Sequence, residues 1–391
     1  MKKLKKPVAR SSNGVYELKS ATINGYEYTK TYYKMENGVP VRCENGDDGC
    51  LTIVNIRKVG DESEHKRAFI FSEGYIGAER SYNEDGTKSK SISKKDGFGV
   101  AYLIKYIENS KENGIDNFHV MFLSDKETSE NQAELYAQAI KDISEGVEKT
   151  FIWNHSKAGL LALRTFEKLK EAGDLETLSK IKAVLTSIPT KGIDTVNREK
   201  MINKLENNKF VNILPFSGFI KNGLLAWYDT FLYKPTPAQV DMKKDNTELQ
   251  LRPTKGSKFF NKLWGNDTFH KRVENAKKVP YDEGYLSRTT SSESLEKIED
   301  VDYKVLPVNL EFKDALNGLV KHGQLMPFIL LAKKALSREK GDGIVTYSEQ
   351  GMEDINAKYK TDTVVRSGHD MPTTPDALET IKEELLDDEE R

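Results

Sequence analysis

The sequence predicts an α/β protein with a doubly wound, mostly parallel sheet, an inserted helical cap and an N-terminal β-rich extension. Three observations predict this class. Residues 66–190 alternate short apolar runs with amphipathic helix patterns, which is typical of βαβ units. The residues before this stretch show only strand and turn patterns. Those from 193 to 300 contain no convincing strand.

The extension covers residues 1–65. Its segment "YEYTKTYYKM" alternates aromatic and polar residues, "LTIVNI" is rich in β-branched residues, and "NG" and "DDG" mark turns. Cys43 and Cys50 flank a Gly/Asp-rich turn. Their spacing suits a hairpin disulfide as well as two thiols in a reducing compartment. Because no histidine lies nearby, we expect no zinc site there.

The core is expected to comprise residues 66–192 and 301–391. Apolar runs predict its strands, and apolar residues at helical spacing predict the helices between them. Ligands of such sheets bind outside the carboxyl ends of the strands, so the strand-to-helix loops are expected to carry the chemistry. The expected strands are 67–72, 117–124, 149–154, 181–188, 303–312 and 361–368, and the expected helices are 98–114, 129–146, 157–173, 319–341 and 374–386.

Residues 193–300 are expected to form a mostly helical cap. The cap contains the segment "FSGFIKNGLLAWYDTFLY", in which large apolar residues recur at loosely helical spacing. Burial is the default for such residues, so we expect them to form the core of the cap; the alternative is a groove for an acyl chain. The residues are Phe216, Phe219, Leu224, Leu225, Trp227, Phe231 and Tyr233.

Ser156, in "FIWNHSKAGLLAL", follows a predicted strand and opens a predicted helix. In that setting a sharp turn can lift the hydroxyl of a nucleophilic serine above the sheet. Serine is also among the preferred N-caps of helices, so the motif alone leaves both interpretations open. The sharp turn needs small residues two before and two after the serine, and these positions hold Asn154 and Ala158.

A nucleophilic serine needs a base and an acid that orients the base. His369 is the candidate base because it lies in a loop directly after the last predicted strand; an ordinary loop histidine is the alternative. Asp342 is the candidate acid, and the alternative is a common Asp-Gly turn. The order Ser, Asp, His is the one expected when these groups follow successive strands. Weaker candidates for the acid are Asp300, Asp302 and Asp370.

An oxyanion hole would combine the backbone N–H of Lys157, which follows the serine, with one from the loop after an early strand. The segment "FIFSEGYIGAE" supplies such a loop, in which glycines would let the N–H of Tyr75 face the site. An ordinary glycine turn is the alternative interpretation.

Taken together, these segments resemble the lipase branch of the α/β-hydrolase superfamily over roughly residues 66–391. "NHSKAG" is similar to the G-H-S-x-G-G nucleophile elbow of that family, "EGYIG" to its H-G-x-x-G oxyanion loop, "GDGIVTYSE" to the segment around its acid, and "GHDM" to the loop of its histidine. In this chain Glu73 stands where the family has histidine, and Asn154 and Ala158 replace both elbow glycines.

The resemblance implies a serine hydrolase that cleaves carboxylic esters, with lipid or acyl esters as substrates and with no metal or organic cofactor. Ser156 would be the nucleophile, Asp342 the acid and His369 the base, while Tyr75 and Lys157 would donate the oxyanion-hole N–H groups. The expected substrate contacts are Gly74, His155, Trp227 and Phe231. The alternatives are a thioesterase or amidase with the same triad, and a hydrolase-fold binding module that has lost efficient catalysis.

The charge balance indicates no nucleic-acid partner, because 60 Lys and Arg residues nearly cancel 61 Asp and Glu residues. The basic start "MKKLKKPVAR" is followed by polar sequence rather than by the apolar region of a signal peptide, and no apolar span reaches membrane length. We therefore expect a cytoplasmic protein without a transmembrane segment that contacts lipid surfaces transiently. Export by a non-standard route is the alternative.

Overall fold

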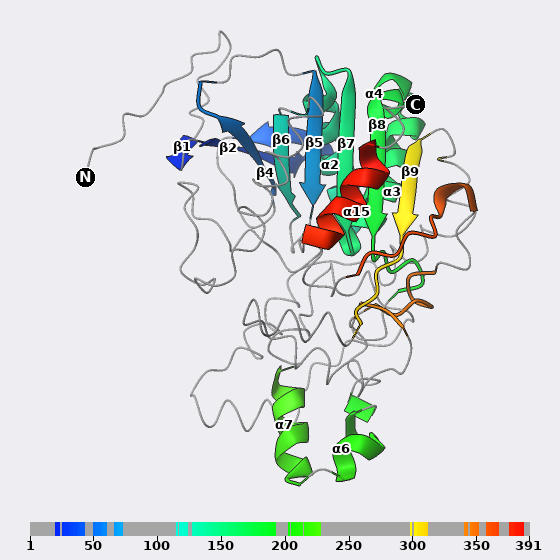
Figure 1. Ribbon diagram of the computed structural model, residues 1–391. Helices are drawn as coiled ribbons and strands as arrows, with labels where there is room; N and C mark the ends of the chain where they lie inside the picture. Colours follow the sequence, from blue (N-terminus) through cyan, green and yellow to red (C-terminus); the bar gives the residue numbers. More distant parts are fainter. Residues whose placement is uncertain are drawn as a thin grey trace.

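Figure 1 shows the computed structural model of the protein. It describes residues 20–23, 26–43, 50–60, 66–72, 115, 117–123, 127–192, 202–203, 205–213, 215–227, 298, 301–311, 340–342, 345–351, 357–366 and 375–386. The expected helices 98–114 and 319–341 lie outside these residues, apart from the last two positions of the second one. None of the helices in the described ranges is long and apolar enough to cross a membrane.

Within the described residues, the strands form a single nine-stranded sheet in the order β1-β2-β4-β6-β5-β7-β8-β9, with β3 paired to β2. The strands are β1 (Ser20–Ile23), β2 (Tyr26–Glu36), β3 (Val39–Cys43), β4 (Leu51–Lys58), β5 (Arg67–Ser72), β6 (Asn117–Phe122), β7 (Lys149–His155), β8 (Ile181–Thr186) and β9 (Asp302–Leu306). The strands from β5 to β9 pair in parallel, whereas β1 to β4 pair antiparallel. The sheet is therefore mixed, with a parallel part from β5 to β9, and together with its helices it gives an α/β fold.

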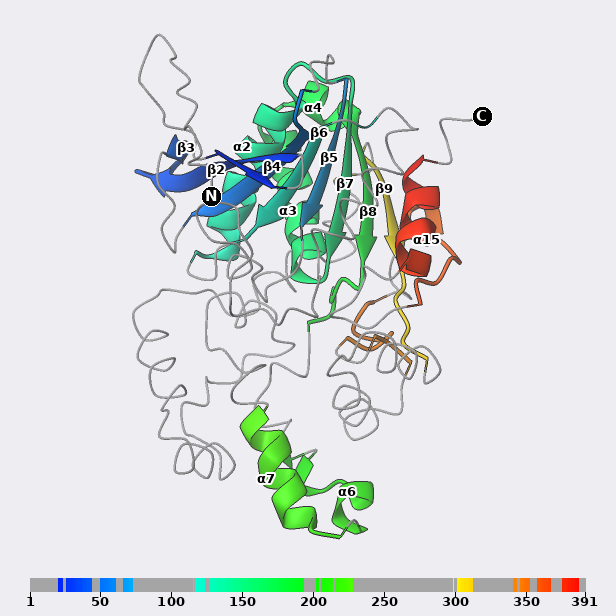
Figure 2. The same cartoon turned by 60° about the vertical axis from the view of Figure 1, so that its left-hand side comes forward.

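Helices cover both faces of the sheet (Figures 1 and 2). On one face lie α2 (Ser129–Ser144), α3 (Lys157–Glu171) and α4 (Leu175–Lys180), and on the other lies α15 (Pro375–Leu386). Strand β7 shows how the two cores divide: Ile152 packs into the core below α2 and α3, whereas Phe151 and Trp153 pack into the core below α15. Strands buried on both faces read as continuous apolar runs, which is why this part of the chain was predictable.

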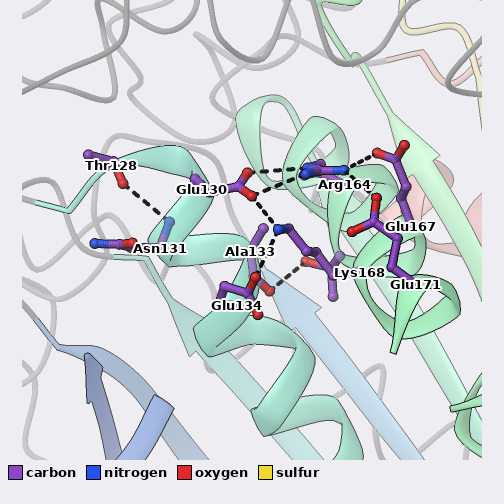
Figure 3. A network of polar contacts seen from close by, with 10 residues as sticks. Thr128, Glu130, Asn131, Ala133, Glu134, Arg164, Glu167, Lys168 and Glu171 are labelled. Atoms are coloured by element: carbon purple, nitrogen blue, oxygen red, sulfur yellow. Dashed lines mark hydrogen bonds and ion pairs between the residues drawn. The ribbon is translucent and has the colours of Figure 1, made fainter. Parts of the chain in front are cut away.

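Ion pairs hold α2 and α3 together (Figure 3). Arg164 of α3 donates from Nε and from Nη2 to the two carboxylate oxygens of Glu130 of α2, at 3.2 and 3.1 Å. Lys168, one turn further along α3, pairs with Glu130 and, at 2.8 Å, with Glu134. Burial opposes the ionisation of Glu130, but its hydrogen bonds to Arg164 and Lys168 outweigh this and lower the pKa of the carboxyl.

Strands β1 to β4 continue the sheet of the core. Asn37 and Gly38 both take positive φ, of 54° and 79°, which is the requirement of the tight turn that joins β2 to β3. Tyr33 of β2 donates its hydroxyl to Asp142 of α2 at 2.8 Å, and burial raises the pKa of this phenol. Contacts of this kind tie the expected extension to the parallel part of the molecule.

Cys43 and Cys50 lie next to each other without a disulfide between them. Their Sγ atoms are 3.7 Å apart, whereas a disulfide bond is about 2.05 Å long. Of the two arrangements that their spacing allowed, the structure has the pair of thiols.

The C-terminal part of the sheet is shorter than expected. Strand β9 ends at Leu306, because Pro307 follows and has no N–H to donate to a neighbouring strand. The strand expected at 361–368 is reduced, in its described part, to one bridge between Val365 and Val308. The hydroxyls of Thr361 and Thr363 donate instead to Glu384 of α15, at 3.1 and 2.6 Å.

Two helices, α6 (Lys209–Ile213) and α7 (Ser217–Trp227), lie on the side of the sheet toward which the parallel strands point (Figures 1 and 2). Leu224 and Leu225 are buried, as expected, and pack with Leu205 and Val211; the assignment of this region as a cap stays a prediction. The expected burial is wrong for Phe216 and Phe219, which are 85% and 67% exposed. These two residues lie at the turn into α7, beyond the face that α7 buries against α6. Phe231, Tyr233 and the side chain of Trp227 lie outside what the structure describes.

Candidate active site

The strand order has a switch point between β6 and β7, on the two sides of β5. From β5 the chain runs to β6 on one side of it and then returns to β7 on the other side. Such a switch point in a parallel sheet leaves a crevice outside the carboxyl ends of the two strands, and this is where ligands of α/β sheets bind. Ser156 is the first residue after β7, so it lies at this point of the fold.

Ser156 does not cap α3. Its backbone has φ 57° and ψ −130°, and its side chain makes no capping hydrogen bond. An N-cap residue would be extended and would accept a hydrogen bond from the first turn of the helix. The conformation of Ser156 is one that usually requires glycine, because L side chains crowd the backbone there. A tight turn, residues 154–159, therefore joins β7 to α3, and we refer to it as the Ser156 turn.

Asn154 stabilises the Ser156 turn through its side-chain amide. Its Nδ2 donates to the hydroxyl of Tyr136 at 2.7 Å and to the carbonyl of Ala158 at 3.3 Å. All three residues are fully buried, and burial raises the pKa of Tyr136. The two positions expected to require small residues are thus linked to each other, and the amide of Asn154 also anchors the turn to α2.

Gly159, the residue after Ala158, is the position in the Ser156 turn where the backbone passes close to a neighbouring side chain. A Cβ atom at this position would lie 2.1 Å from Cγ2 of Ile188, a buried residue just after β8. The backbone N–H of Gly159 donates to the carbonyl of Ser156 at 3.0 Å, and the N–H of Ser156 donates to the carbonyl of Thr186 at 2.9 Å. The turn therefore depends on glycine three residues after the serine and on the end of β8.

His155 lies against the end of β8. Its Nδ1 is 3.0 Å from Oγ1 of Thr186, which also accepts a hydrogen bond from Nε1 of Trp153 at 3.1 Å. The imidazole is buried. The substrate contact expected of His155 stays a prediction.

Lys157 begins α3 with its side chain inside the protein. Its Nζ donates to Oε1 of Gln132 in α2 at 3.2 Å, and Gln132 donates in turn to the carbonyl of Glu127 at 2.8 Å. The backbone N–H of Lys157 belongs to the first turn of α3, the end of the helix at which the helix dipole favours negative charge. An oxyanion would be stabilised at this end of the helix.

Asp342 is fully buried at the same edge of the sheet. One carboxylate oxygen accepts the backbone N–H of Val345 at 2.7 Å, and the other accepts the hydroxyl of Ser187, the first residue after β8. Gly341 has φ 152°, and a Cβ atom there would lie 2.4 Å from the carbonyl oxygen of Val345. The role of Asp342 as the acid stays a prediction.

Of the other candidate acids, Asp302 is exposed at the start of β9, where its register partner is Lys182 at the start of β8. It thus lies at the edge of the sheet opposite to Ser156. The remaining predicted positions lie outside the described residues, namely Gly74, Tyr75, Phe231, His369, Asp300 and Asp370.

The structure therefore brings Ser156, Lys157 and Asp342 to one edge of the sheet. Two consecutive residues that the sequence analysis did not name as site residues, Thr186 and Ser187, connect them. Thr186 accepts the N–H of Ser156, and Ser187 donates to Asp342. A signal for them was present in the sequence: both lie in the last three positions of the predicted strand 181–188, and the carboxyl ends of parallel strands are where site residues gather.

No family model matches the chain, and no curated protein matches it. Solved structures similar to it include the mature form of the Bacillus licheniformis lipase BlEst2, with 14% identity and a TM-score of 0.38 over 82% of this chain and 92% of the other. A thermostable esterase from Pseudomonas putida has 11% identity and a TM-score of 0.40 over 94% of this chain and 84% of the other. At these values neither likeness establishes what this chain does.

Proposed function

We propose that the chain is a serine hydrolase that cleaves carboxylic esters through an acyl-enzyme. The observation that carries the proposal is the backbone of Ser156, which is strained, buried and makes no capping bond. A conformation of this kind costs on the order of 1–3 kcal/mol and persists only where the surrounding structure holds it, which happens preferentially at functional sites. Such a turn points a serine hydroxyl out of the end of the sheet.

In the proposed reaction Oγ of Ser156 forms a bond to the ester carbonyl carbon while His369 accepts the hydroxyl proton. The tetrahedral intermediate then expels the alcohol, which takes the proton back from His369. Water attacks the acyl-enzyme by the same steps and releases the carboxylic acid. Asp342 would hold the imidazole in the required tautomer, and its burial and its two hydrogen bonds support that assignment.

The oxyanion would be bound by the backbone N–H groups of Lys157 and Tyr75. For Lys157 the support is its place in the first turn of α3, directly after the strained serine. The position of Tyr75 rests on the sequence motif alone.

For the substrate we propose esters with an acyl chain, presented at a lipid surface. Three apolar side chains on α6 and at the turn into α7, Ile213, Phe216 and Phe219, are 78%, 85% and 67% exposed, and we call them the apolar tip. Exposed apolar side chains that lie together mark interaction sites in soluble proteins. The apolar tip lies on the side of the sheet where the parallel strands end (Figure 2).

The first experiment is hydrolysis of p-nitrophenyl esters from acetate to palmitate by the wild type and by Ser156→Ala, together with labelling by a fluorophosphonate probe. We expect the substitution to abolish both hydrolysis and labelling, and the best chain length to separate an esterase from a lipase. A wild type that neither hydrolyses any ester nor reacts with the probe would contradict the proposal and favour a binding module.

The second experiment tests the lipid surface. Phe216→Ser combined with Phe219→Ser is expected to reduce co-sedimentation with phosphatidylcholine vesicles and hydrolysis of long-chain esters, while acetate hydrolysis is unchanged. Leu175→Ser is the control, because Leu175 is 59% exposed on α4, away from the apolar tip. Equal vesicle binding by all three proteins would remove the lipid surface from the proposal and leave the ester hydrolase.

A further inference from the structure

The last residue of β8 and the residue that follows it connect the Ser156 turn to the buried carboxylate. Thr186 ends the strand and accepts the backbone N–H of Ser156 at 2.9 Å. Ser187 follows it and donates its hydroxyl to Asp342. Asp342 lies 155 positions further along the chain, so the two-residue segment couples parts of the molecule that are far apart in sequence.

Ser187 has the features of a residue held in place for its side chain. It is fully buried and has φ 54°, a left-handed conformation that serine rarely adopts. A buried carboxylate is costly unless it is hydrogen-bonded, and hydrogen bonds to charged groups are the stronger ones. The hydroxyl of Ser187 and the N–H of Val345 bind different oxygens of Asp342, so together they fix the plane of the carboxylate.

We propose that Ser187 is a positioning residue for the reaction and holds the Asp342 carboxylate in the orientation in which it receives the N–H of the catalytic base. The inference rests on the proposed function. A carboxylate has about four lone-pair sites, so two fixed donors determine where the remaining lone pairs point. Thr186 binds the backbone of Ser156 and Ser187 binds the carboxylate of Asp342, so the end of β8 positions both the nucleophile and the acid.

The loop that carries Asp342 has other attachments to the segment after β8. The hydroxyl of Thr190 donates to the carbonyl of Gln350 at 3.1 Å, and the N–H of Lys191 donates to the carbonyl of Glu349 at 3.2 Å. The side chain of Gln350 binds both the N–H and the carbonyl of Val308 at 3.1 Å. Removing the hydroxyl of Ser187 is therefore expected to release one oxygen of the Asp342 carboxylate, while the loop stays attached to the segment after β8.

The test compares two variants that each remove one hydroxyl from this contact region. Ser187→Gly removes the hydroxyl bound to Asp342, and glycine accepts a positive φ without strain, so this variant is expected to fold. Thr190→Val removes the hydroxyl that binds the carbonyl of Gln350, which touches the same loop but not the carboxylate. Both are measured for kcat and KM on the best p-nitrophenyl ester and for unfolding in urea.

We expect Ser187→Gly to lower kcat about tenfold to a hundredfold, as for the loss of one hydrogen bond to a charged group, with KM unchanged. Thr190→Val is expected to keep the wild-type kcat, although it lowers the resistance to urea. Equal losses of kcat in the two variants, or a loss confined to KM, would overturn the proposal, because a loosened loop would then account for the result.

A second measurement does not depend on activity. A double-mutant cycle of Ser187→Gly and Asp342→Ala, followed by urea unfolding, is expected to show non-additivity of about fivefold or more in the unfolding equilibrium constant. Additive effects would overturn the inference even in an active enzyme. If the wild type neither hydrolyses esters nor labels at Ser156 while the coupling is present, the proposed function fails and the Ser187–Asp342 contact stands as a structural clamp only.

Discussion

Ser156 and Phe216 share a backbone feature and differ in everything around it. Both have positive φ, of 57° and 59°, and both directly precede a helix, α3 and α7. Ser156 is 2% exposed, and its backbone N–H donates a hydrogen bond to Thr186 at the end of β8. Phe216 is 85% exposed, and its carbonyl accepts the N–H groups of Phe219 and Ile220 in its own turn.

The difference shows what a strained residue needs in order to present a side chain in a fixed direction. Strain in the backbone of Ser156 is held by tertiary contacts of the turn, through Gly159, Asn154 and Thr186. Strain at Phe216 is held by a local turn, which is enough to expose an apolar ring. The first arrangement is the kind that a proposed catalytic residue requires, and the second is the kind that a proposed contact with a lipid surface requires.

The largest effect is expected from Gly159→Ala. Its new Cβ would lie 2.1 Å from Cγ2 of Ile188. Because Ile188 is buried and β-branched, it cannot move aside cheaply, and we expect the free energy of unfolding to fall by about 3 kcal/mol, the upper range for overpacking. Ester hydrolysis should fall with it, since the Ser156 turn would shift. Urea unfolding and kcat measure the two effects, and a stability equal to the wild type would show that the turn is not held by this contact.

Asn154→Ala is expected to be the next most damaging change. It removes the bonds to Tyr136 and to the carbonyl of Ala158 and leaves buried polar groups without their partner, which costs about 2 kcal/mol. Tyr136→Phe is the matched control, because it removes only the hydroxyl partner and should cost less. Asn154→Gly removes the same amide and places glycine two residues before the serine. If it were more stable than the wild type by urea unfolding, the stabilising contribution of the amide would be disproved.

Gly223→Ala should have the opposite sign to Gly159→Ala. Gly223 lies inside α7, and a Cβ atom there meets nothing within 4 Å. Alanine favours a helix interior over glycine by roughly 0.5–1 kcal/mol, so we expect a gain of that size. Thermal unfolding measures it. A loss of stability would mean that α7 is packed as tightly as α3, and the contrast between the two regions would disappear.

The smallest expected effect concerns the ion pairs of α2 and α3 that flank the Ser156 turn. Glu130→Gln should lower the free energy of unfolding by about 0.5 kcal/mol at neutral pH, a small value because Glu130 is 36% exposed and solvent screens its pairs. The pKa of Glu130 is lowered from the ordinary 4.5, so its contribution is present above that pH and is lost as the pH falls through the lowered value. The difference from the wild type should therefore shrink in acid, and a difference that is constant from pH 7 to pH 3 would contradict this assignment.

The sequence by itself determined the local elements and the place of the candidate nucleophile. Residues 129–144 and 157–171 are helical and 149–155 and 181–186 are strands, close to the expected bounds, because apolar periodicity reflects which side of each element is buried. Ser156 stands between a strand and a helix as predicted. His369 and Tyr75 stay predictions.

Only the tertiary structure decided how these elements are used. The positive φ of Ser156, the contact between Ser187 and Asp342, and the exposure of Phe216 have no signature in a local pattern. Each depends on packing between elements: Ser187 meets a carboxylate 155 positions away, and the cluster between α6 and α7 buries Leu224 and Leu225 but does not include Phe216. Periodicity predicts that a residue is buried or exposed on its own element, whereas packing between elements decides which partner it meets.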